Sequence, residues 1–391
     1  MDPIRNPYAP GAGQRPPELA GRDGELHGFD VVLERVSRSR PERSIVLTGL
    51  RGVGKTVLLN AMRSAAVRRG WGTGKLEARP DQSLRRPLAG ALHLAVRELG
   101  ARKDQADHVL GVVKSFAQRE AGTSAKLREK WSPGIDVPAV PGRTDSGDIE
   151  IDLVELFRDV AGLAADTGKG IAIFIDEMQD LGPDDVSALC AACHELSQHG
   201  LPLVVVGAGL PHLPAVLSAA KSYSERLFRF ARIDRLERPA ADAALQRPAQ
   251  DEDAAWESDA LEEMYTATGG YPYFVQAYGK ATWDAAPGPT ITAADVTVAA
   301  PEAAAELAVG FFGSRFERAT PAEREYLRAM AEAGGEDVAT SAVADLLGKQ
   351  PQSLSPARDG LLKKGLVYSG QRGRIAFTVP HFGAYLRAQD L

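Results

Sequence analysis

SIVLTGLRGVGKTVLLN, residues 44–60, decides the fold of this 391-residue chain. It begins with an apolar run typical of a buried strand, continues with a glycine-rich loop and ends in a helical pattern. The loop, GLRGVGKT, fits the spacing G-x-x-x-x-G-K-[S/T], in which backbone N–H groups and a helix N-terminus face a phosphate. The stretch therefore predicts a site for the phosphates of a nucleotide.

Each part of this loop has an expected role. Gly49 and Gly54 let the backbone wrap round the phosphates. Lys55 is expected to bring a positive charge to the β- and γ-phosphates, and the Thr56 hydroxyl to bind Mg²⁺. The residues expected to contact the nucleotide are Gly49, Leu50, Arg51, Gly52, Val53, Gly54, Lys55, Thr56 and Val57.

A second motif, IAIFIDEMQDL at 171–181, supplies the acids that such a site needs. Asp176 follows five apolar residues, so it is expected at the end of a buried strand, as a Mg²⁺ carboxylate beside Thr56. Glu177 is expected to orient or deprotonate an attacking water. Gln179 is open to two interpretations, a contact with the γ-phosphate or an ordinary polar loop residue. The two motifs together predict ATP and Mg²⁺ as ligands.

Composition narrows the class of protein. The chain has 44% apolar and 25% charged residues, a formal charge of −6 and a pI near 5.8. These values exclude a generally basic nucleic-acid coat, although a local basic patch remains open. The sequence has no uninterrupted apolar run of the length a membrane span needs, and no apolar signal core near the N-terminus. A cytoplasmic location without a membrane partner is expected.

The order of periodic segments predicts several domains. Residues 1–20 are expected as a flexible or docked tail, and 21–235 as an α/β core with a parallel sheet covered on both faces. Within the core, 131–148 reads as a loop or linker insertion. Residues 236–316 predict a helical lid. Residues 317–391 predict three helices and then a hairpin, which is the order of a winged helix.

The two motifs carry a family resemblance. GLRGVGKT with FIDEMQ resembles the Walker A and Walker B pair of the AAA+ and STAND branch of P-loop ATPases. More narrowly, the chain resembles bacterial and archaeal ATPases similar to the origin-recognition and Cdc-type initiators. PELAGRDGEL, residues 17–26, is similar to the box whose backbone holds adenine in those proteins, which implies nucleotide contacts at Gly21 and Arg22. The resemblance implies an AAA+ core, a helical lid and a terminal winged helix.

The resemblance also implies an arginine finger. SYSERLFRFARIDRLERP, 222–239, is similar to the segment that carries this residue, and Arg226 takes its place. In that role Arg226 acts in trans on the nucleotide of a neighbouring copy in a homo-oligomer. The other interpretation is a solvated or ion-paired face formed by Arg226, Arg229 and Arg232. One departure bears on the choice, because Glu225 separates Ser224 from the arginine.

Two further departures favour slow turnover. The strand LPLVVVGAG ends in Gly207, Ala208 and Gly209, where the family places a polar residue that senses the γ-phosphate. Tyr273 stands where the initiators tend to place a second sensor, an arginine. Both changes suit a slow nucleotide switch, in which bound ATP or ADP fixes the lid and the domain beyond it.

The winged-helix region carries a local positive charge. Between 349 and 374 the chain has six basic residues and one acid, a local charge near +5. This pattern is typical of a helix in the major groove of double-stranded DNA with a wing along the backbone. The alternative is a packing or protein-docking module. The expected DNA contacts are Gln352, Ser353, Arg358, Lys363, Lys364, Arg372 and Arg374.

Three functions therefore compete. The first is a slow ATP hydrolase that engages DNA through its winged helix, as initiators, loaders and transposition adaptors do. The second is a STAND-like signalling or defence switch, whose nucleotide state controls self-association or a protein partner without DNA. The third is a degenerate protein that binds nucleotide without turnover.

Overall fold

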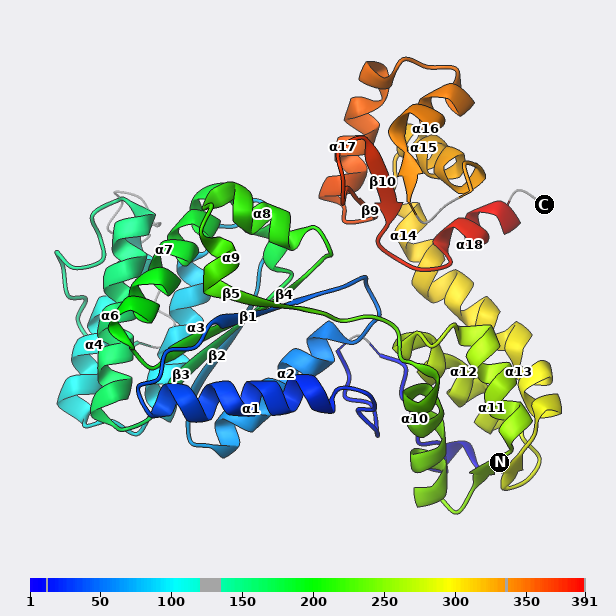
Figure 1. Cartoon of the computed structure of the whole chain (residues 1–391), viewed down its shortest axis with the longest axis horizontal. Helices are drawn as coiled ribbons and strands as arrows, with labels where there is room; N and C mark the ends of the chain where they lie inside the picture. The colour runs from blue at the N-terminus through cyan, green and yellow to red at the C-terminus, as the bar shows by residue number, and fades with distance from the viewer. Residues whose placement is uncertain (12, 120–134, 335–336, 390–391) are drawn as a thin grey trace.

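The computed structural model describes residues 1–11, 13–119, 135–334 and 337–389. Figure 1 shows three bodies, with the core on the left, the lid at the lower right and the C-terminal domain at the upper right. We use "lid" for residues 236–306, "connector" for 307–317 and "C-terminal domain" for 318–389. The phosphate loop lies at the junction of the three.

The core contains the predicted parallel sheet, with strand order β2-β3-β4-β1-β5. Its strands β1, β3 and β4 are buried along their whole length, which explains why their sequences are apolar without alternation. The α/β prediction is confirmed. The strands are β1 Ser44–Thr48, β2 Gly72–Glu77, β3 Ile171–Asp176, β4 Leu203–Gly209 and β5 Phe228–Arg232.

Helices cover both faces of the sheet (Figure 1). On one face, Ile45 and Leu47 pack with α1 and α2, and on the other, Val46 and Ile173 pack with α3, α4, α6 and α7. The helices are α1 Asp23–Ser37, α2 Lys55–Arg68, α3 Arg85–Glu98, α4 Lys103–Gln118, α6 Ile149–Asp166, α7 Pro183–His199, α8 Leu213–Ala220 and α9 Ser224–Leu227, with the short turn η3 Met178–Asp180 after β3.

Residues 135–148 of the expected insertion at 131–148 form a loop that packs on the core. Residues 131–134 lie outside the described residues. Residues 135–148 form no helix or strand, yet Ile135 and Thr144 are buried. The Thr144 hydroxyl donates to the Val112 carbonyl at 3.0 Å, so this stretch packs on α4. The loop is thus anchored to the core at these two residues, and this position of an irregular segment was not evident from its sequence.

The lid is mainly helical, as predicted. It also contains one short parallel strand pair, β6 with β7, which the sequence did not indicate. Its elements are α10 Arg238–Asp251, β6 Ala255–Trp256, α11 Ser258–Thr268, α12 Pro272–Ala285, β7 Thr290–Ile291 and α13 Ala293–Glu306.

The N-terminal residues are docked on the lid, not flexible (Figure 1). They include the short turn η1 Pro3–Arg5. Tyr8 is only 3% exposed, and its hydroxyl donates to the Leu245 carbonyl at 2.7 Å while accepting from Trp256 Nε1 at 2.8 Å. Two satisfied polar contacts let this tyrosine sit in the lid core. The tail therefore belongs structurally to the lid.

One continuous helical stretch, Ala293–Glu317, leads from the lid into the C-terminal domain. It runs from α13 through η4 Leu307–Gly313, a π-helical segment, into α14 Ser314–Glu317. Among the described residues, this stretch alone is long and apolar enough to cross a membrane by length and composition, with a mean hydropathy of 1.3. In the structure its Phe311 and Phe312 lie in the apolar cluster shared by core, lid and C-terminal domain. The stretch is thus the link between lid and C-terminal domain.

The C-terminal domain has the predicted order of three helices and a hairpin. The hairpin strands pair with a third short strand in the antiparallel order β8-β10-β9. The description as a winged helix stays a prediction. The elements are α15 Pro321–Glu332, β8 Val338–Ala339, α16 Thr340–Leu347, η5 Pro351–Leu354, α17 Ser355–Lys363, β9 Val367–Tyr368, β10 Arg374–Phe377 and α18 Phe382–Ala388.

Candidate nucleotide site

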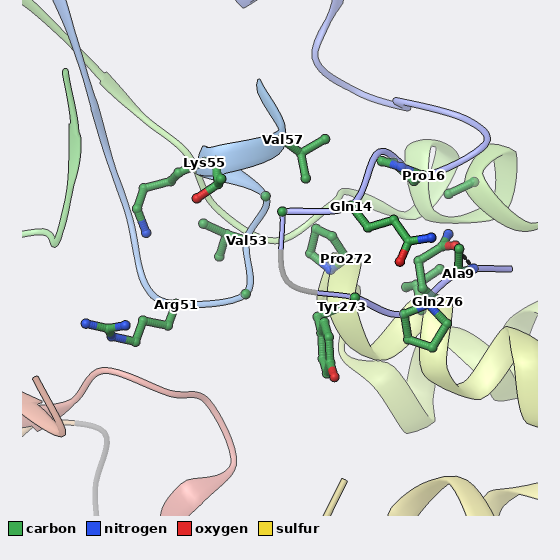
Figure 2. A pocket seen from close by; sticks show the side chains of 18 of the residues that line it. Ala9, Gln14, Pro16, Arg51, Val53, Lys55, Val57, Pro272, Tyr273 and Gln276 are labelled. Atoms are coloured by element: carbon green, nitrogen blue, oxygen red, sulfur yellow. Dashed lines mark hydrogen bonds between the residues drawn. The ribbon is translucent and has the colours of Figure 1, made fainter. Parts of the chain in front are cut away.

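A cavity of about 400 Å³ lies between the phosphate loop, the N-terminal tail and the lid. Figure 2 shows the loop on one side, and Gln14 of the tail with Tyr273 and Gln276 of the lid on the other. Seven consecutive residues, Arg51 to Val57, line it from the core. The cavity combines an apolar part near the tail and lid with a cationic part at the loop, as a nucleotide requires.

The loop adopts a backbone that depends on its glycines. Gly52 and Gly54 have φ angles of +87° and +91°, in the left-handed region that side chains rarely adopt. A Cβ on Gly49 would lie 2.1 Å from the carbonyl oxygen of Ile233. These three positions therefore accept glycine alone without movement of the loop.

Lys55 is buried, and its ammonium group donates to the carbonyl oxygens of Gly49 and Leu50 at 2.8 Å each. Burial lowers the Lys55 pKa to about 8, since desolvation disfavours the charged form. Gly49 and Leu50 themselves line a second cavity on the side of the C-terminal domain, and not the nucleotide cavity. In this structure both residues contact Lys55, and their nucleotide contact stays a prediction.

The two residues predicted to bind Mg²⁺ converge. The Thr56 hydroxyl donates to Asp176 Oδ2 at 2.8 Å, although 120 positions separate them in sequence. A hydroxyl and a carboxylate suit Mg²⁺, which usually takes few protein ligands and completes its shell with water and phosphate. The described residues contain no cluster of three or more His, Cys, Asp or Glu, which fits such a sparse site. Thr56 and Asp176 would hold the ion, and its charge would neutralise the phosphates.

Glu177 is held on both carboxylate oxygens. Arg51 Nη1 lies 3.3 Å from Glu177 Oε1, and Gln179 Nε2 donates to Glu177 Oε2 at 2.7 Å. The backbone of Glu177 has a φ of +48°, a strained conformation for this residue type. Burial, with a smaller effect of Glu177, raises the pKa of neighbouring Asp180 to about 6. Both oxygens of the expected general base are thus engaged.

Arg51 also connects the loop to the C-terminal domain. Its backbone N–H donates to the Thr378 carbonyl at 2.9 Å. Its guanidinium lies against Gly365, where an added Cβ would come within 2.8 Å of Nη2. In Figure 2 the side chain leaves the loop toward the C-terminal domain, in pale red. One residue therefore touches the expected general base and the C-terminal domain together.

Arg315 is a cation in this cavity that the motifs did not reveal. Tyr273 stacks on Phe311 with ring centroids 4.8 Å apart, and the Arg315 guanidinium lies 4.0 Å from the Phe311 centroid. Burial, followed by repulsion from Arg51 and Arg318, lowers the Arg315 pKa to about 10. The π-helical segment brings this part of the connector to the cavity, and π-helical turns often mark functional sites. No local sequence signal identifies Arg315, since the long-range fold alone brings it there.

Of the two residues implied at the adenine, Arg22 lines the cavity and Gly21 does not. Arg22 Nη2 donates to the carbonyls of Val53, at 3.2 Å, and Asp234, at 2.5 Å. Burial lowers the Arg22 pKa. Gly21 has a φ of +68° and packs beside the lid, where a Cβ would lie 2.8 Å from Ala240. Arg22 thus links the phosphate loop to the segment between β5 and the lid.

Arg226 lies away from the nucleotide cavity of its own chain. It is exposed on α9, directly before β5. Phe228 at the start of β5 pairs with Ser44 at the start of β1, whereas the phosphate loop follows the end of β1. Arg226 therefore lies near the N-terminal ends of the strands, whereas the phosphate loop follows the C-terminal end of β1. A role of Arg226 in trans stays a prediction.

The surface predicted to bind DNA is less positive than its sequence suggests. Arg374 pairs with Asp337 at 2.6 Å, Lys364 pairs with Glu323, and Arg358 lies beside Asp359. Lys349 pairs with Glu325 at 2.8 Å. The count over 349–374 missed Glu323, Glu325 and Asp337, because they are distant in sequence. Among the described residues, the exposed candidates that form no ion pair are Gln352, Ser353, Lys363 and Arg372.

Comparisons with known proteins agree with the fold. Residues 18–206 match the family model described as an AAA ATPase domain, and residues 309–386 match one described as a domain of unknown function, DUF8462. No curated protein matches the chain. The Walker-type ATPase PABY2304 of Pyrococcus abyssi is similar in structure, with a TM-score of 0.57, 17% identity and coverage of 95% of this chain and 97% of that one.

Two further solved structures are similar over most of the chain. The Orc1 protein of Aeropyrum pernix, solved in complex with DNA, has a TM-score of 0.47 at 15% identity, covering 96% of this chain and 94% of that one. Cdc6p of Pyrobaculum aerophilum has a TM-score of 0.46 at 15% identity, covering 99% and 97%. Of these three structures, the Pyrococcus protein has the TM-score that supports the fold, and its likeness says nothing of a partner.

Proposed function

We propose that the chain, whose residues 18–206 match an AAA ATPase domain, is a slow ATP-hydrolysing switch whose nucleotide state sets the position of its C-terminal domain. One observation carries this proposal. Arg51 of the phosphate loop donates its backbone N–H to Thr378 of the C-terminal domain and pairs with Glu177. A nucleotide that enters the loop must act on both contacts.

The proposed reaction is hydrolysis of ATP to ADP and phosphate. The oxygen of a water bonds to the γ-phosphorus, the bond from that phosphorus to the β–γ bridging oxygen breaks, and Glu177 accepts the water proton. Lys55 neutralises phosphate charge, while Thr56 and Asp176 hold Mg²⁺. The pairing of Glu177 with Arg51 supports slow turnover, because Oε1 must leave Arg51 before it can contact the attacking water.

The connector supports transmission of the nucleotide state. Arg315 lines the nucleotide cavity from α14, and the same helix leads into the C-terminal domain. Phe311 contacts Phe312, with ring centroids 5.3 Å apart, and Phe312 stacks on Tyr385 of α18 at 5.2 Å. An apolar path of aromatic rings thus joins the cavity wall to the C-terminal domain.

The proposal is tested by steady-state ATP turnover. The wild-type chain is compared with Lys55→Ala, which removes the phosphate cation, and Glu177→Gln, which removes the base but keeps its volume. We expect slow turnover that both variants reduce by ~100-fold or more. Wild-type turnover equal to that of Lys55→Ala would refute the enzymatic part.

Double-stranded DNA is the partner we propose for the C-terminal domain. Gln352 and Ser353 are exposed at the start of the helical segment, and Arg372 is exposed in the hairpin turn. Together with Lys363 they offer the hydrogen-bonding and cationic groups that contact bases and phosphates. In this proposal Arg358, Lys364 and Arg374 stabilise the C-terminal domain through their ion pairs and contribute less to DNA binding.

DNA binding is tested by anisotropy of a labelled duplex across salt concentrations. Lys363→Ala combined with Arg372→Ala should weaken binding and reduce the slope of log affinity against log salt by about 2. The matched control, Lys349→Ala with Arg374→Ala, removes two basic residues that are ion-paired within the domain and should change the slope less. Equal effects of the two double variants, or an affinity that does not change with salt concentration, would count against DNA binding by this surface.

The STAND-like alternative keeps the same switch with a protein output. The internal ion pairs of the C-terminal domain favour it, because they lower the charge available to DNA. In this reading, ATP changes self-association, with Arg226 reaching the nucleotide of a neighbouring copy. Light scattering decides between the two: a mass that rises with Mg·ATP, falls back in Arg226→Ala and ignores DNA supports the alternative.

A further inference from the structure

Two glycines at the end of β4 leave space that the side chains of the turn η3 fill. A Cβ on Gly207 would lie 2.4 Å from Met178 Sδ, and one on Gly209 would lie 2.6 Å from Gln179 Oε1. Met178 and Gln179 belong to η3, directly after the acids of β3. The end of β4 has no polar side chain of its own. The amide side chain of Gln179 therefore occupies the place where such a side chain would lie.

Gln179 bridges the expected base and the central strand. Its Nε2 donates to Glu177 Oε2 at 2.7 Å, and its Oε1 accepts from the backbone N–H of Leu210 at 3.0 Å. Both ends of the amide are thus used, so the side chain has one orientation that satisfies both contacts. Through this bridge the Glu177 carboxylate is tied to the backbone that follows β4.

Glu177 needs such support. Its left-handed φ of +48° is unfavourable for a residue with a side chain, and surrounding contacts must offset that cost. Its side chain is held by two groups, Arg51 on Oε1 and Gln179 on Oε2. Arg51 belongs to the phosphate loop and touches the C-terminal domain, so it moves with either. Gln179 is anchored to the end of β4 and does not depend on them.

We infer that Gln179 is a positioning residue for Glu177 in ATP hydrolysis. Gln179 holds Oε2 throughout turnover, while Oε1 exchanges its Arg51 partner for the attacking water. The inference rests on the proposed hydrolysis of ATP. It also gives a chain-specific reason for Gly207 and Gly209, since any larger residue there would displace the turn that carries Gln179.

Two substitutions separate positioning from simple bracing of the turn. Gln179→Met keeps the length of the side chain and loses both hydrogen bonds. Gln179→Glu keeps an acceptor for the Leu210 N–H but replaces the donor to Glu177 with a negative charge. Gln82→Ala is the matched control, because Gln82 is an exposed glutamine that lines the neighbouring outer cavity.

The measurement is kcat and KM for ATP, with melting temperatures to show that each variant is folded. We expect both Gln179 variants to lose kcat by ~10-fold or more, with KM within about threefold of wild type, because positioning acts on the reacting step. Gln82→Ala should match wild type in both constants. A wild-type kcat in Gln179→Glu with a loss in Gln179→Met would show that the glutamine only braces the turn, and would overturn the inference.

Failure of the inference is distinguishable from failure of the proposed function. Wild-type turnover above that of Lys55→Ala, with both Gln179 variants within twofold of wild type, refutes positioning by Gln179 and leaves hydrolysis intact. Wild-type turnover no higher than that of Lys55→Ala refutes both.

Discussion

The binding of ATP should weaken as the pH rises above 8, because of Lys55. Burial lowers the pKa of this amine from 10.5 to about 8. In the nucleotide-free chain Lys55 is therefore charged at pH 7.5 and mostly neutral at pH 9.5. Bound phosphates restore the charged form, since their negative charge raises the pKa back toward its ordinary value. Above pH 8 the chain must take up a proton to bind ATP.

The magnitude follows from these two pKa values. With a free pKa of about 8 and a bound pKa near 10.5, the linkage relation gives an affinity loss of about 20-fold between pH 7.5 and pH 9.5, or ~1.8 kcal/mol. Below pH 7 the effect vanishes, because Lys55 is protonated in both states. The predicted profile is flat at low pH and falls with increasing steepness above pH 8.

The assay is equilibrium binding of Mg·ATP to Glu177→Gln, in which turnover is suppressed. Lys55→Arg on the same background is the control, because a guanidinium keeps its charge over this range. The Lys55→Arg variant should bind Mg·ATP more weakly, but its affinity should not fall with pH as the wild-type affinity does. A flat wild-type profile between pH 7.5 and 9.5, or the same slope in Lys55→Arg, would refute the assignment of the effect to Lys55.

Three further predictions concern other parts of the chain. Arg315 lines the nucleotide cavity, and we expect its guanidinium to bind the terminal phosphate of ATP. Arg315→Ala should therefore weaken ATP binding by ~10- to 100-fold and ADP binding by less than about threefold in calorimetry, since a hydrogen bond to a charged group contributes ~1.5–3 kcal/mol; equal losses for both nucleotides would contradict this contact. Tyr8→Phe should lower the free energy of unfolding by ~1–3 kcal/mol in denaturant titrations, because Trp256 Nε1 loses its buried acceptor; an unchanged value would contradict docking of the tail. Gly49→Ala should weaken nucleotide binding by ~10-fold or more, because its Cβ meets a backbone carbonyl, whereas Gly24→Ala, with open space around it, should bind as wild type does; equal binding by the two variants would contradict the packed loop.

The sequence predicted the elements that depend on local patterns. The phosphate loop and the buried strands β1, β3 and β4 follow from glycine spacing and runs of apolar residues, and the structure places them at those residues. The meeting of Thr56 with Asp176 was also predictable, since β1 and β3 are strands of one parallel sheet and both residues lie at the carboxyl ends of those strands, with β4 between them. Such features depend on residues that are close together in the sequence.

Features that depend on distant contacts were not predictable in the same way. Arg315 reaches the nucleotide cavity because a π-helical segment and the packing of the connector place it there. The acids that neutralise the predicted DNA surface, such as Glu323 and Asp337, lie outside the window in which charge was counted. The role of Gly209 became visible only through its distance to Gln179. Each of these needs the coordinates of residues far apart in sequence.

The coupling of nucleotide to the C-terminal domain is the central claim, and a distance across that contact tests it most directly. Spin labels at Val67→Cys on α2 and Leu346→Cys on α16 occupy exposed positions, whereas the native Cys190 and Cys193 are buried. The distance distribution is measured by pulsed electron paramagnetic resonance in Glu177→Gln, with and without Mg·ATP. We predict that Mg·ATP shifts the distribution and that Lys55→Ala abolishes the shift. Superimposable distributions with and without saturating Mg·ATP would contradict the switch.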